Sequence, residues 1–241
     1  MISFIIPTLN EEKVIEKLIT NLREIKVFPY EIIISDGGST DKTLEIVKPL
    51  ADKVVEHTKK TRQTIGQGRN AGAAQAVGDF LIFLDADVYI FYPDDFFKRA
   101  LKHFQDDNRL VGLGGWLRVF PEMETLGDRI GYNIFTNWAL TLHNNVFKTG
   151  YNCGEFGVIR TEVFRKIGGY REDLAVNEDG ELFHRLVGVG KTKTDSKLLV
   201  YHTGRRPHKV GWLKLLWTWN KNYFSYLLFN RSADKEWEVI R

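Results

Sequence analysis

The chain has 241 residues, 43% hydrophobic and 27% charged, a composition typical of a globular protein rather than a disordered one. Its net charge of +3, from 34 Lys and Arg against 31 Asp and Glu, excludes binding to nucleic acid through a strongly basic surface. The single cysteine, Cys153, excludes an internal disulfide and a cysteine-based zinc site, and indicates a reducing compartment.

The amino-terminal stretch MISFIIPTLNEE has no basic segment ahead of its apolar run, so no signal peptide is predicted. No window of about 18 residues is both apolar and uncharged, so no transmembrane helix is predicted either. Together with the cysteine content, these features predict a cytoplasmic location.

The first 90 residues alternate short apolar runs with segments of helical periodicity. Thr8 and Glu11 have the spacing of a capping box, which predicts the start of a helix there. Strands are predicted at residues 2–7, 30–35, 53–57 and 80–84, and helices near residues 14–25, 42–47 and 66–77. This order predicts a mainly parallel sheet covered by helices on both faces.

The second part of the chain has a different texture. Pro93 opens an amphipathic helix over 93–104, whereas residues 111–150 are rich in Gly, Trp, Phe and Asn and are expected to be less regular. Later strands are predicted at 155–160 and 197–202, with a helix between them. From Gly211 onward the chain is dense in Trp, Tyr and Leu, and a final helix is predicted there.

Two carboxylates, Asp85 and Asp87, follow the strand at 80–84. In an extended segment their side chains point to the same side, just beyond the edge of the sheet where α/β proteins bind ligands. Such a pair repels unless a proton or a cation separates it, and Mg2+ and Mn2+ prefer oxygen ligands that bridge to phosphates. The pair is interpreted as a metal–phosphate site; the alternative is that these residues end a strand and cap the next helix.

Two further loops favour the first interpretation. SDGGSTD, which contains Asp36, follows a buried strand, and its glycines permit close approach of a nucleotide to the backbone. GQGRNAG, at another helix start, carries Arg69, whose guanidinium can bind a phosphate with two hydrogen bonds. The alternatives are an ordinary turn capped by Ser39 or Thr40, and glycines that serve only helix packing.

These segments resemble, in chain order, the family 2 glycosyltransferases, which have the GT-A fold. The resemblance covers residues 2–202 and is carried by FIIPTLNEE, EIIISDGGSTDKT, GQGRNAGAAQAVGDFLIFLDADV and GVIRTEVFRKIGGYREDLAVNEDGELFHRL. It implies an α/β, Rossmann-like and mostly parallel sheet in a GT-A domain over 1–205, with a donor half at 1–90 and an acceptor half at 91–205. An aromatic-rich helical appendage is expected over 206–241.

The resemblance also implies roles for residues of the donor half. The donor would be a UDP- or GDP-sugar, with Pro7 and Glu11 lining the nucleoside pocket. Asp36 would contact the base, and an imino N–H of uracil or guanine would suit it equally. Arg69 would contact the base or the pyrophosphate.

The metal and catalytic positions follow from the same resemblance. Asp85 would lie near the ribose of the donor or a metal-bound water, Ala86 would also contact the donor, and Asp87 would bind Mn2+ or Mg2+ directly. His202 matches a position where some members supply a further metal ligand; a structural histidine at a strand end, or His208 as the ligand, is the alternative.

The later acidic motif of the family corresponds to Glu178 and Asp179. Glu178 would contact the donor, and Asp179 would be the base that takes the proton of the acceptor. The alternative for Asp179 is a helix cap or a first-turn acid beside Glu181. Arg205 and Arg206 would neutralise the leaving diphosphate, unless they form a solvated basic loop.

The expected reaction is a single inverting displacement that moves one sugar to an acceptor hydroxyl or phosphate. The Gln-x-x-Arg-Trp motif of processive members is absent from this sequence, which favours transfer of one sugar. Aromatic residues between 116 and 149 and between 212 and 226 could stack on sugars, lie on a membrane, or cover the flank of the sheet. A lipid-linked acceptor and peripheral association with the cytoplasmic face of a membrane are therefore predicted; the oligomeric state is left open.

Two other classes remain as alternatives. LIFLDADV also fits the D-x-D motif of HAD-type phosphohydrolases, in which Asp85 would be a nucleophile and Asp87 an acid or base. That motif generally opens its domain, whereas here about 80 residues precede it. A non-catalytic nucleotide-sugar-binding subunit is the second alternative, and the presence of Asp179 beside both aspartates argues against it.

Overall fold

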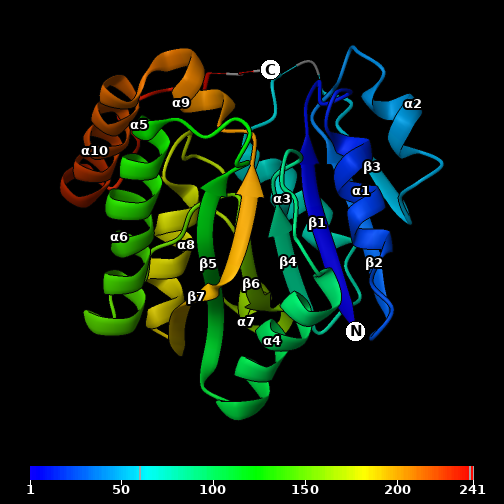
Figure 1. The fold of residues 1–241 in the computed structure, drawn as a ribbon, viewed down its shortest axis with the longest axis horizontal. Helices are drawn as coiled ribbons and strands as arrows, with labels where there is room; N and C mark the ends of the chain where they lie inside the picture. Colours follow the sequence, from blue (N-terminus) through cyan, green and yellow to red (C-terminus); the bar gives the residue numbers. More distant parts are fainter. Residues whose placement is uncertain (60, 239, 241) are drawn as a thin grey trace.

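The computed structural model describes residues 1–59, 61–238 and 240. Strands of the described residues form one sheet in the order β3-β2-β1-β4-β6-β5-β7. It is drawn at the centre of Figure 1. The strands are β1 (Ile2–Thr8), β2 (Tyr30–Asp36), β3 (Lys53–Glu56), β4 (Phe80–Leu84), β5 (Leu110–Val119), β6 (Phe156–Arg160) and β7 (Lys191–His202).

The first four strands are all parallel, with β1 between β2 and β4. β6 lies antiparallel between β4 and β5, and β5 pairs with β7 in parallel. The predicted mainly parallel sheet is confirmed. Because β1, β2 and β4 run in the same direction, the loops that follow Thr8, Asp36 and Leu84 meet at one edge of the sheet.

Helices cover both faces of this sheet, as predicted (Figure 1). Alternate side chains of β1 point to opposite faces, so Phe4 and Ile6 pack beneath α1, α2 and α4, whereas Ile5 packs beneath α3, α7 and α8. The helices are α1 (Ile15–Arg23), α2 (Thr43–Val47), α3 (Ile65–Ala74), α4 (Pro93–Asp106), α7 (Thr161–Lys166), α8 (Glu178–Val187), α9 (Arg205–Val210) and α10 (Trp212–Phe229).

Residues 111–150 are more regular than expected. They contain most of β5 and a long helix at 126–146, built from α5 (Leu126–Asp128), η1 (Arg129–Thr136), α6 (Asn137–Thr141) and η2 (Leu142–Val146). We call this element the long helix. Its two π-helical parts interrupt the usual period, so the apolar pattern in the sequence does not match a regular α-helix.

The predicted capping box of Thr8 and Glu11 was wrong. Thr8 is the last residue of β1, and its hydroxyl donates to Asp36 Oδ2 at 3.0 Å. α1 begins only at Ile15, and its N-cap, Val14, makes no side-chain capping bond. Because β1 runs through Thr8 and the Thr8 hydroxyl stabilises the loop after β2, this hydroxyl is not available to cap a helix.

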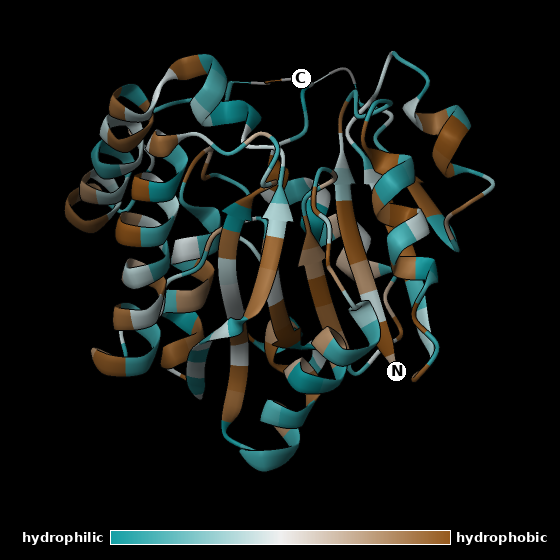
Figure 2. Cartoon of the chain, in the orientation of Figure 1, coloured by the Kyte–Doolittle hydropathy of each residue, from teal (hydrophilic) through white to brown (hydrophobic). Residues whose placement is uncertain are grey.

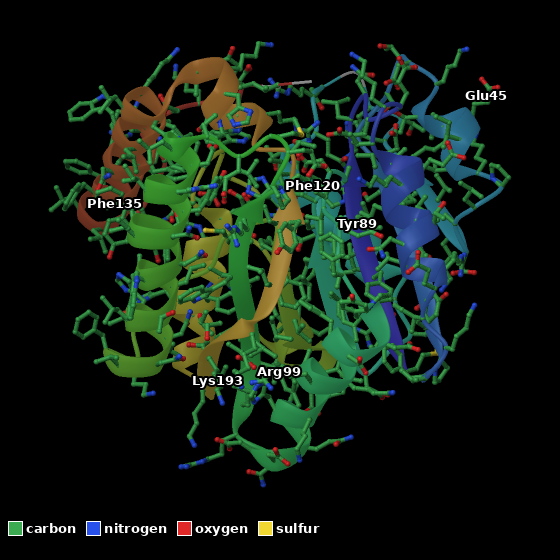
Figure 3. The ribbon with its side chains drawn as sticks, viewed as in Figure 1. Glu45, Tyr89, Arg99, Phe120, Phe135 and Lys193 are labelled. Atoms are coloured by element: carbon green, nitrogen blue, oxygen red, sulfur yellow. The ribbon has the colours of Figure 1, made fainter. Side chains whose placement is uncertain are left out.

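An ion cluster joins α4 to β7. The Asp195 carboxylate accepts from Arg99 Nε at 2.6 Å and lies 2.7 Å from His103 Nε2. Figure 3 labels Arg99 near this junction, with Lys193 of β7 beside it. Burial would raise the pKa of Asp195, but these two partners lower it to about 2. The cluster therefore stabilises the fold only while Asp195 is ionised.

Replacing Asp195 with Asn is expected to lower the free energy of unfolding at pH 7 by about 2 kcal/mol. Each unit by which folding lowers the pKa of a carboxyl group contributes about 1.4 kcal/mol of stability. The pKa of Asp195 in the folded protein lies below the usual 3.8. Its contribution to stability is therefore fully present above pH 3.8 and is lost as the pH falls toward 2. Denaturant unfolding at pH 7 and pH 3 measures it. Asp106→Asn, which removes an exposed pair with Lys102, is the control and should change little at either pH.

Candidate active site

A cavity of about 500 Å³ lies at the sheet edge where β1 and β4 end. Of the ten residues predicted to bind the donor or the metal or to act as the base, nine line it: Pro7, Glu11, Arg69, Asp85, Ala86, Asp87, Glu178, Asp179 and His202. They come from the ends of β1, β4 and β7 and from α3 and α8, so the fold brings together residues separated by almost 200 positions.

Asp36 is the exception. It is 1% exposed, and its carboxylate accepts from the hydroxyls of Thr8 and Ser39 and from the backbone N–H groups of Gly38 and Ser39. Its neighbour Gly37 lines the cavity instead. The Asp36 carboxylate therefore shapes the loop after β2 in this structure.

Arg69 lies at the centre of an acidic cluster. Its Nη1 donates to Asp179 at 2.7 Å and to Glu178 at 3.0 Å, and its Nη2 donates to Asp85 at 3.0 Å and to the Gly154 carbonyl at 3.2 Å. Its side chain is only 1% exposed. The guanidinium that the sequence assigned to the base or the pyrophosphate thus binds three carboxylates of the protein.

The glycines of α3 explain how Arg69 comes so close. A Cβ added to Gly72 would lie 2.7 Å from Ile5 Cγ2, so this residue lets the helix pack directly on β1. A Cβ on Gly154 would lie 2.5 Å from Arg69 Nη2 and 3.0 Å from Asp179 Oδ2. Both glycines are needed for close packing; Gly72 lies on α3 and supports the packing role that the sequence left open for the glycines of GQGRNAG, whereas Gly154 precedes β6.

The two aspartates after β4 are held by different cations. Whereas Asp85 pairs with Arg69, Asp87 accepts from the Thr203 hydroxyl and lies 3.2 Å from Arg205 Nε. Arg205 also forms a two-point ion pair with Glu11, at 2.6 and 2.9 Å. Burial would raise the pKa of Asp87, but Arg205, then the neighbouring histidine and Thr203, lower it. Asp87 is therefore ionised at neutral pH.

His202 ends β7 and is 4% exposed. Burial lowers its pKa to about 4, although Asp87 acts in the opposite direction, so its ring is neutral at pH 7. Its Nδ1 accepts from the backbone N–H of Gly204 at 3.2 Å, whereas its buried Nε2 has no hydrogen-bond partner among the described residues. A neutral ring with Nδ1 as acceptor carries its proton on Nε2. His208, the competing histidine, instead lies 2.7 Å from Asp128.

The first turn of α8 supplies Glu178 and Asp179. The N-cap of that helix is Asn177, so Asp179 is a first-turn residue whose carboxylate is held by Arg69. Burial and the adjacent Asp179 raise the pKa of Glu178 to about 8, against the opposing effect of Arg69. The fold thus places a carboxyl group that is largely protonated at pH 7 beside the proposed base.

Glu155 was not predicted as a site residue. It lies just before β6 and lines the cavity. Burial, together with the nearby carboxylates of Asp85, Asp87 and Asp179, raises its pKa to about 8. Its position in EFGVIR is typical of the start of a strand, and no motif in the sequence distinguishes it.

The other wall of the cavity is apolar and comes from two helices. The long helix contributes Phe135, Ala139 and His143, and α10 contributes Leu216, Trp219 and Tyr223. The segment after α10 also reaches the cavity: the Arg206 guanidinium lies 3.9 Å from the ring centroid of Trp237, and Arg62 donates to the Trp237 carbonyl at 2.6 Å. Part of the predicted appendage therefore belongs to the site.

A sheet with one reversed strand and a carboxylate-rich cavity at its edge defines a GT-A glycosyltransferase fold, and solved structures agree. A mannosyltransferase of Pyrobaculum calidifontis, solved in complex with GDP-Man and Mn2+, matches with a TM-score of 0.69 and 20% identity over 85% of this chain and 57% of its own. Glucosyl-3-phosphoglycerate synthase of Mycobacterium tuberculosis, in complex with Mn2+, UDP and phosphoglyceric acid, matches with a TM-score of 0.64 and 21% identity. The match covers 95% of this chain and 77% of the synthase.

Sequence comparison is more specific. The model of Glycosyl transferase family 2 matches residues 3–168, and the chain belongs to this family. The succinoglycan biosynthesis protein ExoA of Rhizobium meliloti is 30% identical over 86% of this chain and 65% of its own length. A dolichyl N-acetyl-alpha-D-glucosaminyl phosphate glucuronosyltransferase of Methanococcus voltae is 37% identical over 50% of this chain and 40% of its own length. The chain thus spans less than two thirds of the length of these curated relatives.

Proposed function

We propose that this chain transfers a single sugar from a nucleotide-diphosphate sugar to a hydroxyl or phosphate of an acceptor, with inversion at the anomeric carbon. The observation that carries this proposal is the placement of Asp85, Asp87 and Asp179 around one cavity, each held by a buried or half-buried arginine. Family membership favours this function over a HAD-type phosphohydrolase. The presence of Asp85, Asp87 and Asp179 together favours sugar transfer over the role of a non-catalytic nucleotide-sugar-binding subunit.

In the proposed reaction Asp179 takes the proton of the acceptor as its oxygen attacks. Arg69 fixes the orientation of this carboxylate through Nη1, and Gly154 leaves room beside Oδ2. A fixed base of this kind contributes about 100- to 10,000-fold to the rate. Pro7, Glu11, Ala86 and the loop at Asp36 would bind the nucleoside. The donor would be a UDP- or GDP-sugar; one solved structural neighbour holds GDP-Man and another holds UDP.

The residues present fit a divalent cation, Mn2+ or Mg2+. Asp87 is ionised, and the unpartnered Nε2 of His202 is available once the ring proton moves to Nδ1 and the contact with Gly204 opens. In the described part of the chain no three His, Cys, Asp or Glu residues are grouped to hold a metal, so diphosphate oxygens would complete its coordination. A cation held there would stabilise the negative charge of the leaving diphosphate.

We further propose that residues 1–90 bind the donor and that residues 91–205, with the appendage 206–241, bind the acceptor. The apolar wall formed by the long helix and α10 supports a lipid-linked acceptor, the kind named for the Methanococcus relative. Such an acceptor would place the protein peripherally at the cytoplasmic face of a membrane.

Thermal unfolding with UDP, GDP, dTDP and CDP, each with and without Mn2+, tests the donor site. One nucleotide is expected to raise the melting temperature in a metal-dependent way, since a ligand at 100 times its Kd adds about 2.7 kcal/mol. Asp87→Ala should abolish the metal-dependent part of the shift, measured against the melting temperature of the same variant without nucleotide and metal. No shift with any nucleotide would contradict the proposal.

A further inference from the structure

The outer side of the long helix and α10 forms one exposed apolar surface, which we call the aromatic face. Figure 2 colours many positions of these helices as hydrophobic, and Figure 3 labels Phe135 at this edge of the molecule. Leu213 is 87% exposed, Trp217 69% and Leu228 72%. Further exposed members are Ile130, Ile134, Phe135, Trp138, Val146, Phe147, Phe224, Leu227 and Phe229. Apolar side chains in such numbers mark an interaction surface.

Basic charge predominates around the aromatic face, although Arg129, Arg205 and Lys221 pair with acids from neighbouring segments. Residues 129–154 and 196–233, which supply nearly all of this face, contain nine Lys and Arg and no Asp or Glu. The other parts of the chain therefore carry all 31 acidic residues. A surface that is both aromatic and basic matches the chemistry of an anionic lipid headgroup layer.

The inner side of α10 is anchored to the rest of the protein. The Trp212 ring packs on Tyr132 of the long helix at 4.9 Å, and Trp212 Nε1 donates to Asp128 at 3.0 Å. Farther along α10, the buried Asn222 donates to Asp234 at 2.6 Å. These contacts hold α10 in one orientation, so its outer residues form a constant surface.

We propose that the aromatic face docks on an anionic lipid surface, with α10 lying in the plane of the membrane interface. No helix in the described ranges of the chain is long and apolar enough to cross a membrane. A second copy of the chain fits the face less well, because a symmetric contact would bring the same basic residues together.

Docking in this way would also orient the cavity. Phe135 is 54% exposed on the aromatic face and at the same time lines the cavity, so the cavity reaches this surface between the long helix and α10. A lipid-linked acceptor could then enter from the bilayer without leaving it. This last step rests on the proposed function, whereas the docking itself does not.

Co-sedimentation with vesicles tests the inference. The protein is expected to sediment with vesicles of equal parts phosphatidylcholine and phosphatidylglycerol, and much less with phosphatidylcholine alone or at high salt. The double variant Trp217→Ser, Leu228→Ser and the variant Lys214→Glu should each lower the partition coefficient for anionic vesicles by about tenfold or more. Tyr92→Ser and Lys98→Glu, exposed positions on other elements, are the matched controls and should bind like the unchanged chain.

Two results would overturn the inference. Either the unchanged chain stays in the supernatant with anionic vesicles, or the double variant binds them as well as the controls do. A dimer that elutes intact and is broken by the double variant, without vesicle binding, would assign the face to a second copy instead. The nucleotide-induced thermal shift is measured on the same variants. If the thermal shift is kept while vesicle binding is lost, docking has failed but the proposed donor site has not. If vesicle binding is kept while no nucleotide shifts the melting temperature, the proposed function has failed but docking has not.

Discussion

Replacing Asp179 with Asn is expected to lower kcat for sugar transfer by about 100- to 10,000-fold, because the amide cannot take the proton of the acceptor. Asn has nearly the shape of Asp and keeps an oxygen that can accept from Arg69 Nη1, so the site should retain its geometry. The measurement is kcat for transfer from the donor that the thermal unfolding experiment identifies.

The same variant should keep its nucleotide-induced thermal shift, since the proposed base faces the acceptor. Glu181→Gln is the matched control: Glu181 lies two residues along the same helix, pairs with Arg185 and is not part of the cavity lining. Its kcat should be nearly unchanged. If Asp179→Asn transferred sugar as fast as this control, Asp179 could not be the base.

Replacing Arg69 with Met is expected to destabilise the protein by about 3–5 kcal/mol at pH 8, the cost of removing the cation from a buried ion cluster. Asp85, Glu178 and Asp179 would all lose the guanidinium that binds them. Burial already raises the pKa of Asp85, and raises that of Glu178 to about 8, against the opposing effect of Arg69. Without the guanidinium both pKa values would rise further, so the folded state would bind more protons than the unfolded state over a wider pH range. Stability must then fall as the pH rises.

Denaturant unfolding at pH 5 and pH 8 measures this effect, and the deficit of Arg69→Met should be smaller at pH 5. Arg23→Met is the control, because Arg23 forms a half-exposed pair with Asp52 and such pairs contribute about 0–1 kcal/mol. If Arg69→Met lowered the free energy of unfolding by the same amount at both pH values, the carboxyl groups around Arg69 would not depend on its positive charge. That result would contradict the cluster as described.

Most of the fold could be predicted because its signals are local. Apolar runs at 30–35 and 80–84 became β2 and β4 almost residue for residue, and the parallel order follows from helices placed between them. The long helix was missed because its π-helical parts disturb the periodicity on which such predictions rest. Thr8 was assigned to a helix because the capping-box spacing also occurs by chance at a strand end.

The positions of the site residues were easier to predict than their partners. Asp85, Asp87, Asp179 and His202 reach one cavity because they follow strands or begin a helix at the same sheet edge. Arg69, in contrast, was expected to meet a ligand. Its actual partners lie up to 110 residues away in the sequence, and only the packing of α3 on β1 decides which charges surround it. The basic surface around α10 was visible only as a lack of acids, a pattern that no motif describes.

The Arg205 guanidinium, which holds both Glu11 and Asp87, has a consequence for the synthesis of the protein. Glu11 and Arg205 are 194 residues apart, so the ribosome releases the carboxylates of the amino-terminal strands well before the cation that compensates them. At about 5–20 residues per second, the nascent chain spends roughly 10 to 40 seconds before Arg205 can form its ion pair with Glu11. The early strands can pair during that time, but the catalytic cavity closes only when the last part of the chain arrives. An interrupted translation product is therefore incomplete at its active site, however much of its sheet has formed.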